Sequence, residues 1–148
     1  ATLVNSSKTD ADVVIQTVVP AQSTVEGCSD EARGILSMDN CIAITGTDQN
    51  ASEGILAANA NLNVLGSDPE NGDVIGAGFD AGSITIAAVQ DGTFFGAVTP
   101  AFEKLGYYEI YALTAAANGQ DVEDVSVKGL WYDAANMDNK EISPNVYW

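Results

Sequence analysis

Short polar side chains stand at the ends of three apolar segments in this chain. Thr47 and Asp48 follow one such segment. Asp80 directly follows a second, and Thr99 closes a third. Carboxylate and hydroxyl oxygens accept hydrogen bonds from ligand hydroxyl groups without a bound cation, so these residues favour a small polyhydroxylated ligand. Aspartate and threonine at such positions also cap helices and shape turns, and that structural role stays open for each of them.

The sequence offers few other reactive groups. It contains no histidine, which removes the most common general base, the most common metal ligand and any Ser-His-Asp triad. The two cysteines, Cys28 and Cys41, match neither a zinc-site spacing nor a C-x-x-C redox motif. An enzymatic function stays open as an alternative, because Asp48 and Asp80 could form a carboxylate pair of the kind that glycosidases use.

Two oxygen-rich stretches, 68–73 and 133–138, are the only candidates for a calcium site that the sequence suggests. They contain aspartate, glutamate and asparagine, but neither has the full EF-hand pattern. Turns account for both stretches more simply, so we expect no metal site.

Charge limits the partners of this chain. Its 148 residues include 21 acidic and 5 basic ones, which give a formal net charge of −16. Such a surface repels phosphate backbones, so we expect no nucleic-acid partner. No apolar run approaches the roughly 20 residues that a bilayer-spanning helix needs.

The hydrophobic pattern predicts alternating strands and helices. Strands are expected at 11–19, 41–45, 74–79, 94–99 and 125–133. Helices are expected at 25–36 with Ser23 or Thr24 as the cap, at 50–60, at 84–90 with Ser83 as the cap, and at 100–117 before Gly119. This alternation is typical of crossover units on a parallel sheet, which makes the fold class α/β with a parallel sheet flanked by helices. The first strand contains a nearly continuous run of β-branched residues, which predicts burial on both of its faces.

The predicted sheet brings the polar residues together. Ligands of open α/β sheets bind beyond the carboxyl ends of the strands, where Asp48 and Asp80 are expected. Helix geometry also bears on the cysteines, because Cys28 falls near the start of its predicted helix. It should lie roughly 12 Å from the next strand, too far for a disulfide with Cys41. We therefore expect two buried free thiols.

Two segments resemble a known family. The stretch IAITGTDQNASEGI (42–55) and the stretch GFDAGSITIAAVQDGTFFGAVTP (78–100) are similar to type I periplasmic sugar-binding proteins. This is the ribose- and galactose-binding group that feeds ABC importers, and the resemblance covers roughly residues 11–139. It implies a three-layer lobe. It also implies sugar contacts from Asp80, the aspartate of Gly-Phe-Asp, and from Asp48 in the family's Asn-Asp pair.

The chain departs from the family pattern at several site positions. Thr47 replaces the asparagine of the Asn-Asp pair, and Pro100 stands where a glutamine is common. The loop after the first strand lacks the expected aromatic residue and carries Gln22, which we keep as a candidate ligand contact. Trp131 on the last strand could stack on a pyranose ring, with core or hinge packing as its alternative role.

The resemblance also sets the expected domain organisation. Residues 1–10 should form a loop, residues 11–99 a C-terminal lobe, and residues 100–148 a hinge-crossing helix, the last strand and a tail. Family members are about twice as long, so this lobe is expected to be incomplete without an N-terminal half. A second chain or a domain-exchanged dimer would supply that half.

The resemblance finally implies partners, a compartment and a function. The expected partners are a small sugar and the membrane subunits of an ABC importer. The expected location is extracellular or periplasmic, and a membrane anchor preceding Ala1 is left open. The expected function is carbohydrate binding as the solute-binding component of an ABC transporter. Because the resemblance is to non-catalytic binders, it implies that the protein is not an enzyme and needs no cofactor. The alternative is the ligand-sensing domain of a sugar-responsive signalling or regulatory protein.

Overall fold

The computed structural model describes residues 2–4 and 13–146. Near the start of the chain, β1 (Thr2–Val4) and β2 (Val13–Ile15) pair antiparallel in a two-stranded sheet of their own. The side chains of Val14 and Ile15 are 63% and 43% exposed. The prediction of a doubly buried parallel strand at 11–19 is therefore wrong, and β1 interrupts the loop expected at 1–10. The rest of that expected loop lies outside the described residues.

The main sheet holds the other five strands, in the order β3-β5-β6-β7 with β4 also paired to β5. They are β3 (Ala43–Thr45), β4 (Leu65–Gly66), β5 (Val74–Phe79), β6 (Gly96–Pro100) and β7 (Gly129–Tyr132). Strand β5 pairs parallel with β3 and β6, as predicted, and it also pairs parallel with β4.

Strand β7 corrects the expectation of an all-parallel sheet, because it pairs antiparallel with β6. The chain leaves the sheet at Pro100 and returns at Gly129, and these two residues face each other in the ladder. An excursion that departs from and returns to the same end of a sheet reverses the strand direction. Strand β4 was not predicted from the sequence, since two residues carry too little pattern.

The helices lie close to their predicted positions. They are α1 (Val25–Leu36), α2 (Gln49–Leu62), α3 (Ser83–Gln90) and α4 (Phe102–Ala117), with short 3-10 turns at Pro69–Asn71 and Ser143–Asn145. Thr24 caps α1 as expected, because its Oγ1 accepts a hydrogen bond from the Gly27 N–H. Ser83 was expected to cap α3, but it is the first residue of the helix, and Gly82 stands at the cap without a side-chain bond.

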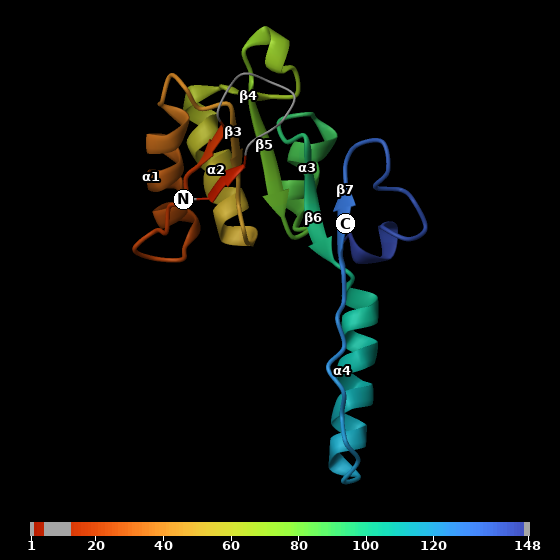
Figure 1. The fold of residues 1–148 in the computed structure, drawn as a ribbon. Helices are drawn as coiled ribbons and strands as arrows, with labels where there is room; N and C mark the ends of the chain where they lie inside the picture. Colours follow the sequence, from red (N-terminus) through yellow and green to blue (C-terminus); the bar gives the residue numbers. More distant parts are fainter. Residues whose placement is uncertain (1, 5–12, 147–148) are drawn as a thin grey trace.

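Helices cover one face of the main sheet. Helices α2 and α3 pack against β3, β5 and β6, and α1 packs against α2 (Figure 1). Alternate residues of β5 from Val74 are buried on that side, whereas Ile75, Ala77 and Phe79 are half-exposed on the other. Among the described residues, no helix covers this second face. The described residues thus supply two of the three expected layers.

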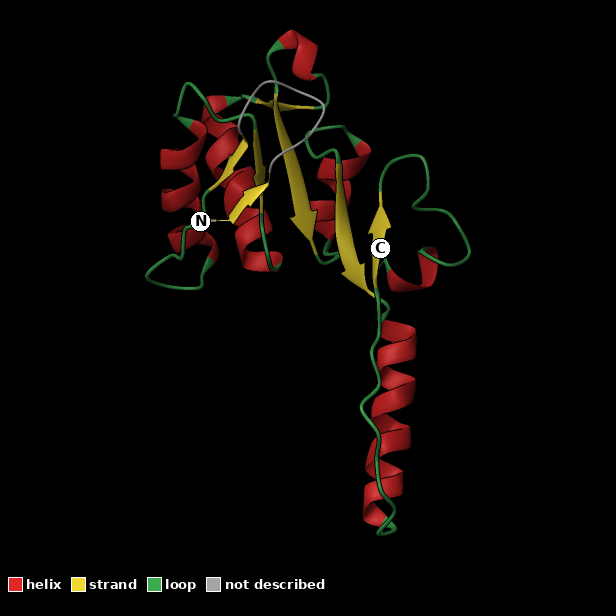
Figure 2. Cartoon of the chain, in the orientation of Figure 1, coloured by secondary structure: helices red, strands yellow, loops and turns green. Residues whose placement is uncertain are grey.

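Helix α4 stands away from the rest of the molecule. It extends past the carboxyl ends of β5 and β6, with an irregular returning segment beside it (Figure 2). Four of its large apolar side chains are 62–68% exposed, namely Tyr107, Ile110, Tyr111 and Leu113. The tail after β7 folds back onto the sheet, where Met137, Ile142 and Val146 join the core. No helix in the described part is both long and apolar enough to cross a membrane.

The cysteines are both free, as predicted. Cys28 is buried against Gly54 of α2, whereas Cys41 is only half-buried. Burial raises the pKa of both thiols, and the nearby Asp48 carboxylate raises that of Cys28 further.

Candidate functional site

The loops after β3 and β5 bring Asp48 and Asp80 together at the carboxyl ends of these parallel strands. Asp48 caps α2, because its Oδ1 accepts a hydrogen bond of 2.8 Å from the Ala51 N–H. The carboxylate of Asp80 accepts a backbone hydrogen bond from Gln49, the first residue of the same helix. Both carboxylates therefore lie at the amino end of α2, where the helix dipole favours negative charge.

The two carboxylates differ in their surroundings. Asp48 and the neighbouring Thr47 are exposed, whereas Asp80 is half-buried. Burial raises the pKa of Asp80, and the charge of Asp48 raises it further, although the Gln49 N–H opposes the shift. Two acceptors of different exposure at one helix end can receive hydrogen bonds from adjacent hydroxyl groups of a small ligand.

Buried hydroxyl groups fix the backbone beneath these carboxylates. The Oγ of Ser52 accepts from the Phe79 N–H at 2.8 Å and donates to the Asp48 carbonyl at 2.8 Å, so it joins the two strand ends. The hydroxyl of Tyr132 donates to the Asp80 carbonyl at 2.7 Å. Ser52 and Tyr132 are both 0% exposed.

Thr99 was predicted as a ligand contact, but the structure does not leave it free for one. The side chain is 0% exposed. Its hydroxyl lies 3.2 Å from the carbonyl of Asn145 in the tail and 3.3 Å from that of Pro100. Thr99 therefore holds the tail against β6 instead of facing a ligand.

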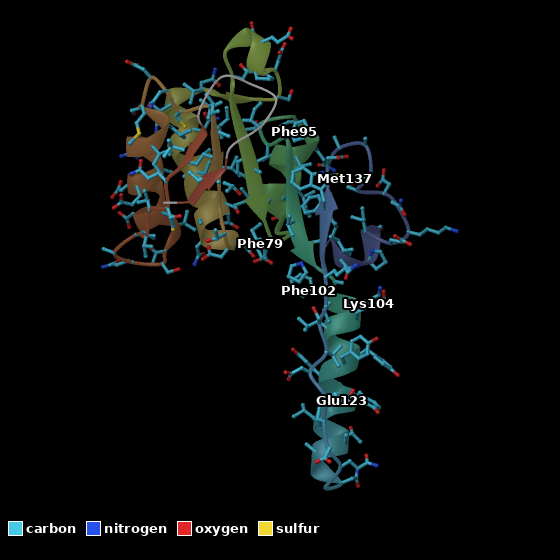
Figure 3. The ribbon with its side chains drawn as sticks, viewed as in Figure 1. Phe79, Phe95, Phe102, Lys104, Glu123 and Met137 are labelled. Atoms are coloured by element: carbon cyan, nitrogen blue, oxygen red, sulfur yellow. The ribbon has the colours of Figure 1, made fainter. Side chains whose placement is uncertain are left out.

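Trp131 is also placed away from the carboxylates. Its ring lies against Gly96, at the amino end of β6, with its centroid 6.1 Å from that of Phe95. Its Nε1 donates to Asp133 at 3.1 Å. Figure 3 shows Phe95 at the opposite end of the sheet from Phe79, which precedes Asp80. The ring of Trp131 thus lies toward the end of the sheet opposite Asp80, where it packs against Gly96 and Phe95.

Gln22 is exposed in the loop before α1. That loop is tied to the start of α2, because Asn50 Nδ2 donates to the Ser23 carbonyl at 3.0 Å. This bond brings the loop to the end of the sheet where Asp48 lies, so Gln22 stays in the candidate set with Thr47.

The sequence analysis missed several residues of this site. Gln49 lies against Gly82, and its side-chain Nε2 donates to the Glu53 carboxylate at 2.8 Å. Ser52 follows Asp48 by one helical turn on the buried side of α2, so helical spacing was a usable signal. Tyr132 carried no such signal, because its partner Asp80 is 52 residues away in the chain.

A metal site would need several ligand side chains close together. The described part of the chain holds no group of three or more histidine, cysteine, aspartate and glutamate side chains that could bind a metal ion. Asp48 and Asp80 are thus two carboxylates with backbone and hydroxyl support, arranged for hydrogen bonding.

The sequence matches no protein-family model and no curated protein. Solved structures match its fold. One, described as an ABC transporter, LacI family transcriptional regulator from Brachyspira murdochii, is 24% identical, has a TM-score of 0.79 and covers 91% of this chain and 44% of its own. An ABC transporter solute-binding protein from Agrobacterium vitis with bound D-fucose is 18% identical, with a TM-score of 0.73, and covers 84% and 42%.

A second solute-binding protein from Agrobacterium vitis, bound with alpha-D-tagatopyranose, is 12% identical, with a TM-score of 0.71, and covers 85% of this chain and 41% of its own. The chain thus spans less than half the length of these solved structures. Its fold is part of the type I periplasmic-binding-protein fold, a mixed sheet flanked by helices, as the resemblance in sequence predicted.

Proposed function

We propose that this chain is part of a solute-binding protein that binds a small sugar for an ABC importer, without catalysis, in an extracellular or periplasmic setting. The observation that carries this proposal is the meeting of Asp48 and Asp80 at the amino end of α2. The fold supports it, because solved structures that share this fold are described as containing D-fucose and alpha-D-tagatopyranose.

The chemistry of the pair suits a neutral sugar better than a charged ligand. Asp48 and Asp80 place two negative charges at the site of a chain whose net charge is −16, so an anionic ligand would be repelled. Sugar hydroxyl groups donate to carboxylates and accept from backbone N–H groups. Gln22 and Thr47 are further proposed contacts at the rim.

Binding without catalysis fits the role of Asp48 as the cap of α2. One of its oxygens is held by the Ala51 N–H as the cap of α2. A glycosidase would need this carboxylate as nucleophile or base beside an acid at a defined separation. The regulatory alternative is disfavoured by the net charge of −16, which would weaken an approach to DNA.

A thermal-shift screen of the complete protein tests this function. Monosaccharides and short oligosaccharides, with D-fucose and D-tagatose among them, should include at least one that raises the melting temperature. Asp48→Asn and Asp80→Asn should each weaken that sugar's affinity by about 10- to 100-fold, the loss expected for hydrogen bonds to a charged group. Asp39→Asn, an exposed carboxylate elsewhere, is the matched control and should bind normally.

Two results would count against the proposal. If no sugar stabilises the complete protein, the carbohydrate assignment fails. Release of reducing sugar from oligosaccharides would instead support the enzymatic alternative.

We also propose that an N-terminal half of the same fold completes the lobe, carried by a second chain or by a domain-exchanged second copy. The support is the uncovered sheet face with Ile75 and Phe79, together with the exposed apolar side chains of α4. Parallel sheets normally have both faces covered, and exposed apolar patches of this kind mark contact surfaces.

A further inference from the structure

Asp80 has an unusual backbone conformation for a residue other than glycine. Its φ of 68° lies in the left-handed region, which Asn63 alone shares with it among the described residues other than glycine. Aspartate tolerates this conformation better than most residues, but it still costs free energy relative to an ordinary φ. Asn63 is explained by its place at the C-cap of α2. Asp80 ends no helix, so its conformation needs another explanation.

Two hydrogen bonds from neighbouring strands hold the main chain of Asp80. Its N–H donates to the Val98 carbonyl of β6 at 2.8 Å. Its carbonyl accepts from the Tyr132 hydroxyl of β7 at 2.7 Å. These bonds fix the peptide groups on both sides of the Asp80 Cα, so they fix the direction in which its carboxylate leaves the backbone.

The hydrogen bond from Tyr132 lies in the interior of the protein. Tyr132 is 0% exposed, and its main chain pairs with Ala97 at the end of the β6–β7 ladder. A phenol with so little freedom donates along one direction. That direction meets a carbonyl 52 residues earlier in the chain.

The carboxylate that results is directed at the start of α2. It accepts from the Gln49 backbone and lies near enough to Asp48 to feel its charge. Asp48 is held separately, through Ser52 and its cap bond to Ala51. Within the β5–β6 pair, Asp80 is held by its bond to Val98, and the bond from Tyr132 is the one that comes from a third strand. The placement of the Asp80 carboxylate relative to Asp48 therefore depends on Tyr132.

We propose that Tyr132 is a positioning residue for sugar binding, which holds Asp80 in its left-handed conformation so that its carboxylate meets the ligand beside Asp48. This inference rests on the proposed function of the site. It also assigns a role in binding to β7, the strand that returns from the α4 excursion.

The first test needs no sugar. In the complete protein labelled with ¹³C and ¹⁵N aspartate, the one-bond Cα–Hα coupling of Asp80 reports its positive φ. Tyr132→Phe keeps the buried ring and removes the hydroxyl, and it should shift this coupling toward that of ordinary aspartates. Tyr111→Phe removes a hydroxyl from an exposed tyrosine of α4 and should leave the coupling unchanged. An unchanged coupling in Tyr132→Phe would overturn the proposal.

The second test uses a double-mutant cycle with D-fucose, or with the sugar that the thermal-shift screen identifies. Tyr132→Phe alone should weaken binding by about 10-fold, because the carboxylate is no longer aimed. In an Asp80→Asn background the same change should cost less than about 2-fold, since Tyr132 acts through that carboxylate. If the losses of affinity from the two single substitutions multiply in the double variant, Tyr132 has a general structural role, and the proposal is contradicted.

A readout on the unaltered protein covers the case in which Tyr132→Phe folds poorly. The Tyr132 hydroxyl proton should exchange slowly with water and show a nuclear Overhauser contact to residue 80 or 81. Its absence would overturn the proposal. Failure of every sugar to bind would remove the proposed function alone, because the coupling and exchange measurements judge the Tyr132–Asp80 link independently.

Discussion

At the residue scale, Asp48 and Asp80 show how environment separates two identical side chains. Asp48 is exposed and caps a helix, whereas Asp80 is half-buried with a raised pKa caused first by burial and then by Asp48. Their convergence could be predicted from the sequence, because each follows a strand whose carboxyl end must lie at one edge of a parallel sheet. The residues that hold them, Ser52 and Tyr132, reach across 27 and 52 residues, and no local pattern encodes such contacts.

The raised pKa of Asp80 predicts a pH dependence of stability. The folded protein holds this proton more tightly than the unfolded chain does, so the group stabilises the fold fully below its ordinary pKa of 3.8. That contribution is lost as the pH rises through the raised value of the folded state. Urea unfolding at a series of pH values should show a smaller decline across this interval in Asp80→Asn than in the wild type.

The control for this prediction is Asp39→Asn, at an exposed site in the turn after α1. It should follow the wild-type pH profile, although the whole acidic surface contributes to that profile. Equal profiles for the wild type and Asp80→Asn would contradict the prediction.

Two buried threonines make a second prediction at this scale. Thr85 and Thr99 are both 0% exposed, but only the Thr85 Oγ1 lacks a hydrogen-bond partner in the described part of the chain. Thr85→Val should therefore leave the free energy of unfolding unchanged or raise it by about 1 kcal/mol. Thr99→Val should lower it by about 1 kcal/mol, because it removes the donor to the Asn145 and Pro100 carbonyls. Chemical denaturation measures both, and the same sign for the two would contradict the account.

At the scale of elements, periodicity predicted the helices well and the strand partners poorly. The helical spacing before and after β3 located α1 and α2, and Gly119 with its φ of 70° ends the α4 region as expected. The β-branched run that contains β2 predicted a central strand, yet β2 pairs with β1 alone. Strand pairing is a property of the assembled sheet, so a run of apolar residues cannot show which neighbour it will have.

The packing of α1 on α2 predicts opposite effects for two glycine substitutions. A Cβ on Gly54 of α2 would lie 2.5 Å from the Cys28 Cβ and 2.9 Å from the Cys28 main-chain carbon, whereas a Cβ on Gly34 of α1 would meet nothing within 4 Å. Gly54→Ala should lower the free energy of unfolding by about 1–3 kcal/mol through overpacking. Gly34→Ala should raise it by about 0.5–1 kcal/mol, because alanine favours a helix.

Denaturant unfolding of the two variants side by side checks this prediction. A stabilising Gly54→Ala would mean that α1 and α2 are not in the close contact described here.

At the scale of the whole molecule, the surface combines strong negative charge with exposed apolar side chains on α4. The net charge of −16 opposes self-association, while Tyr107, Ile110, Tyr111 and Leu113 favour contact with a partner. The resemblance in sequence predicted an incomplete lobe, and the matched structures, of which the chain covers 41–44%, agree with it. Helix α4 stands away from the rest of the chain, at the position where the resemblance implied a hinge-crossing helix (Figure 1).

The exposed face of α4 predicts that the isolated 148-residue chain associates more as salt screens its charge. Analytical ultracentrifugation should show larger species at high salt, and Leu113→Glu should reduce them. Addition of a polypeptide that carries the N-terminal half should replace self-association by a one-to-one complex. The proposed completion of the lobe would be ruled out if the chain were a folded monomer at every salt concentration and did not bind that polypeptide.

The central claim is that two strand ends, carrying Asp48 and Asp80, form a sugar site. Titration of the ¹⁵N-labelled complete protein with its stabilising sugar tests it most directly. Among the residues of this chain, the amide signals of 46–49 and 80–82 should shift first and furthest. Shifts centred on Trp131 and Phe95, at the other end of the sheet, would contradict it.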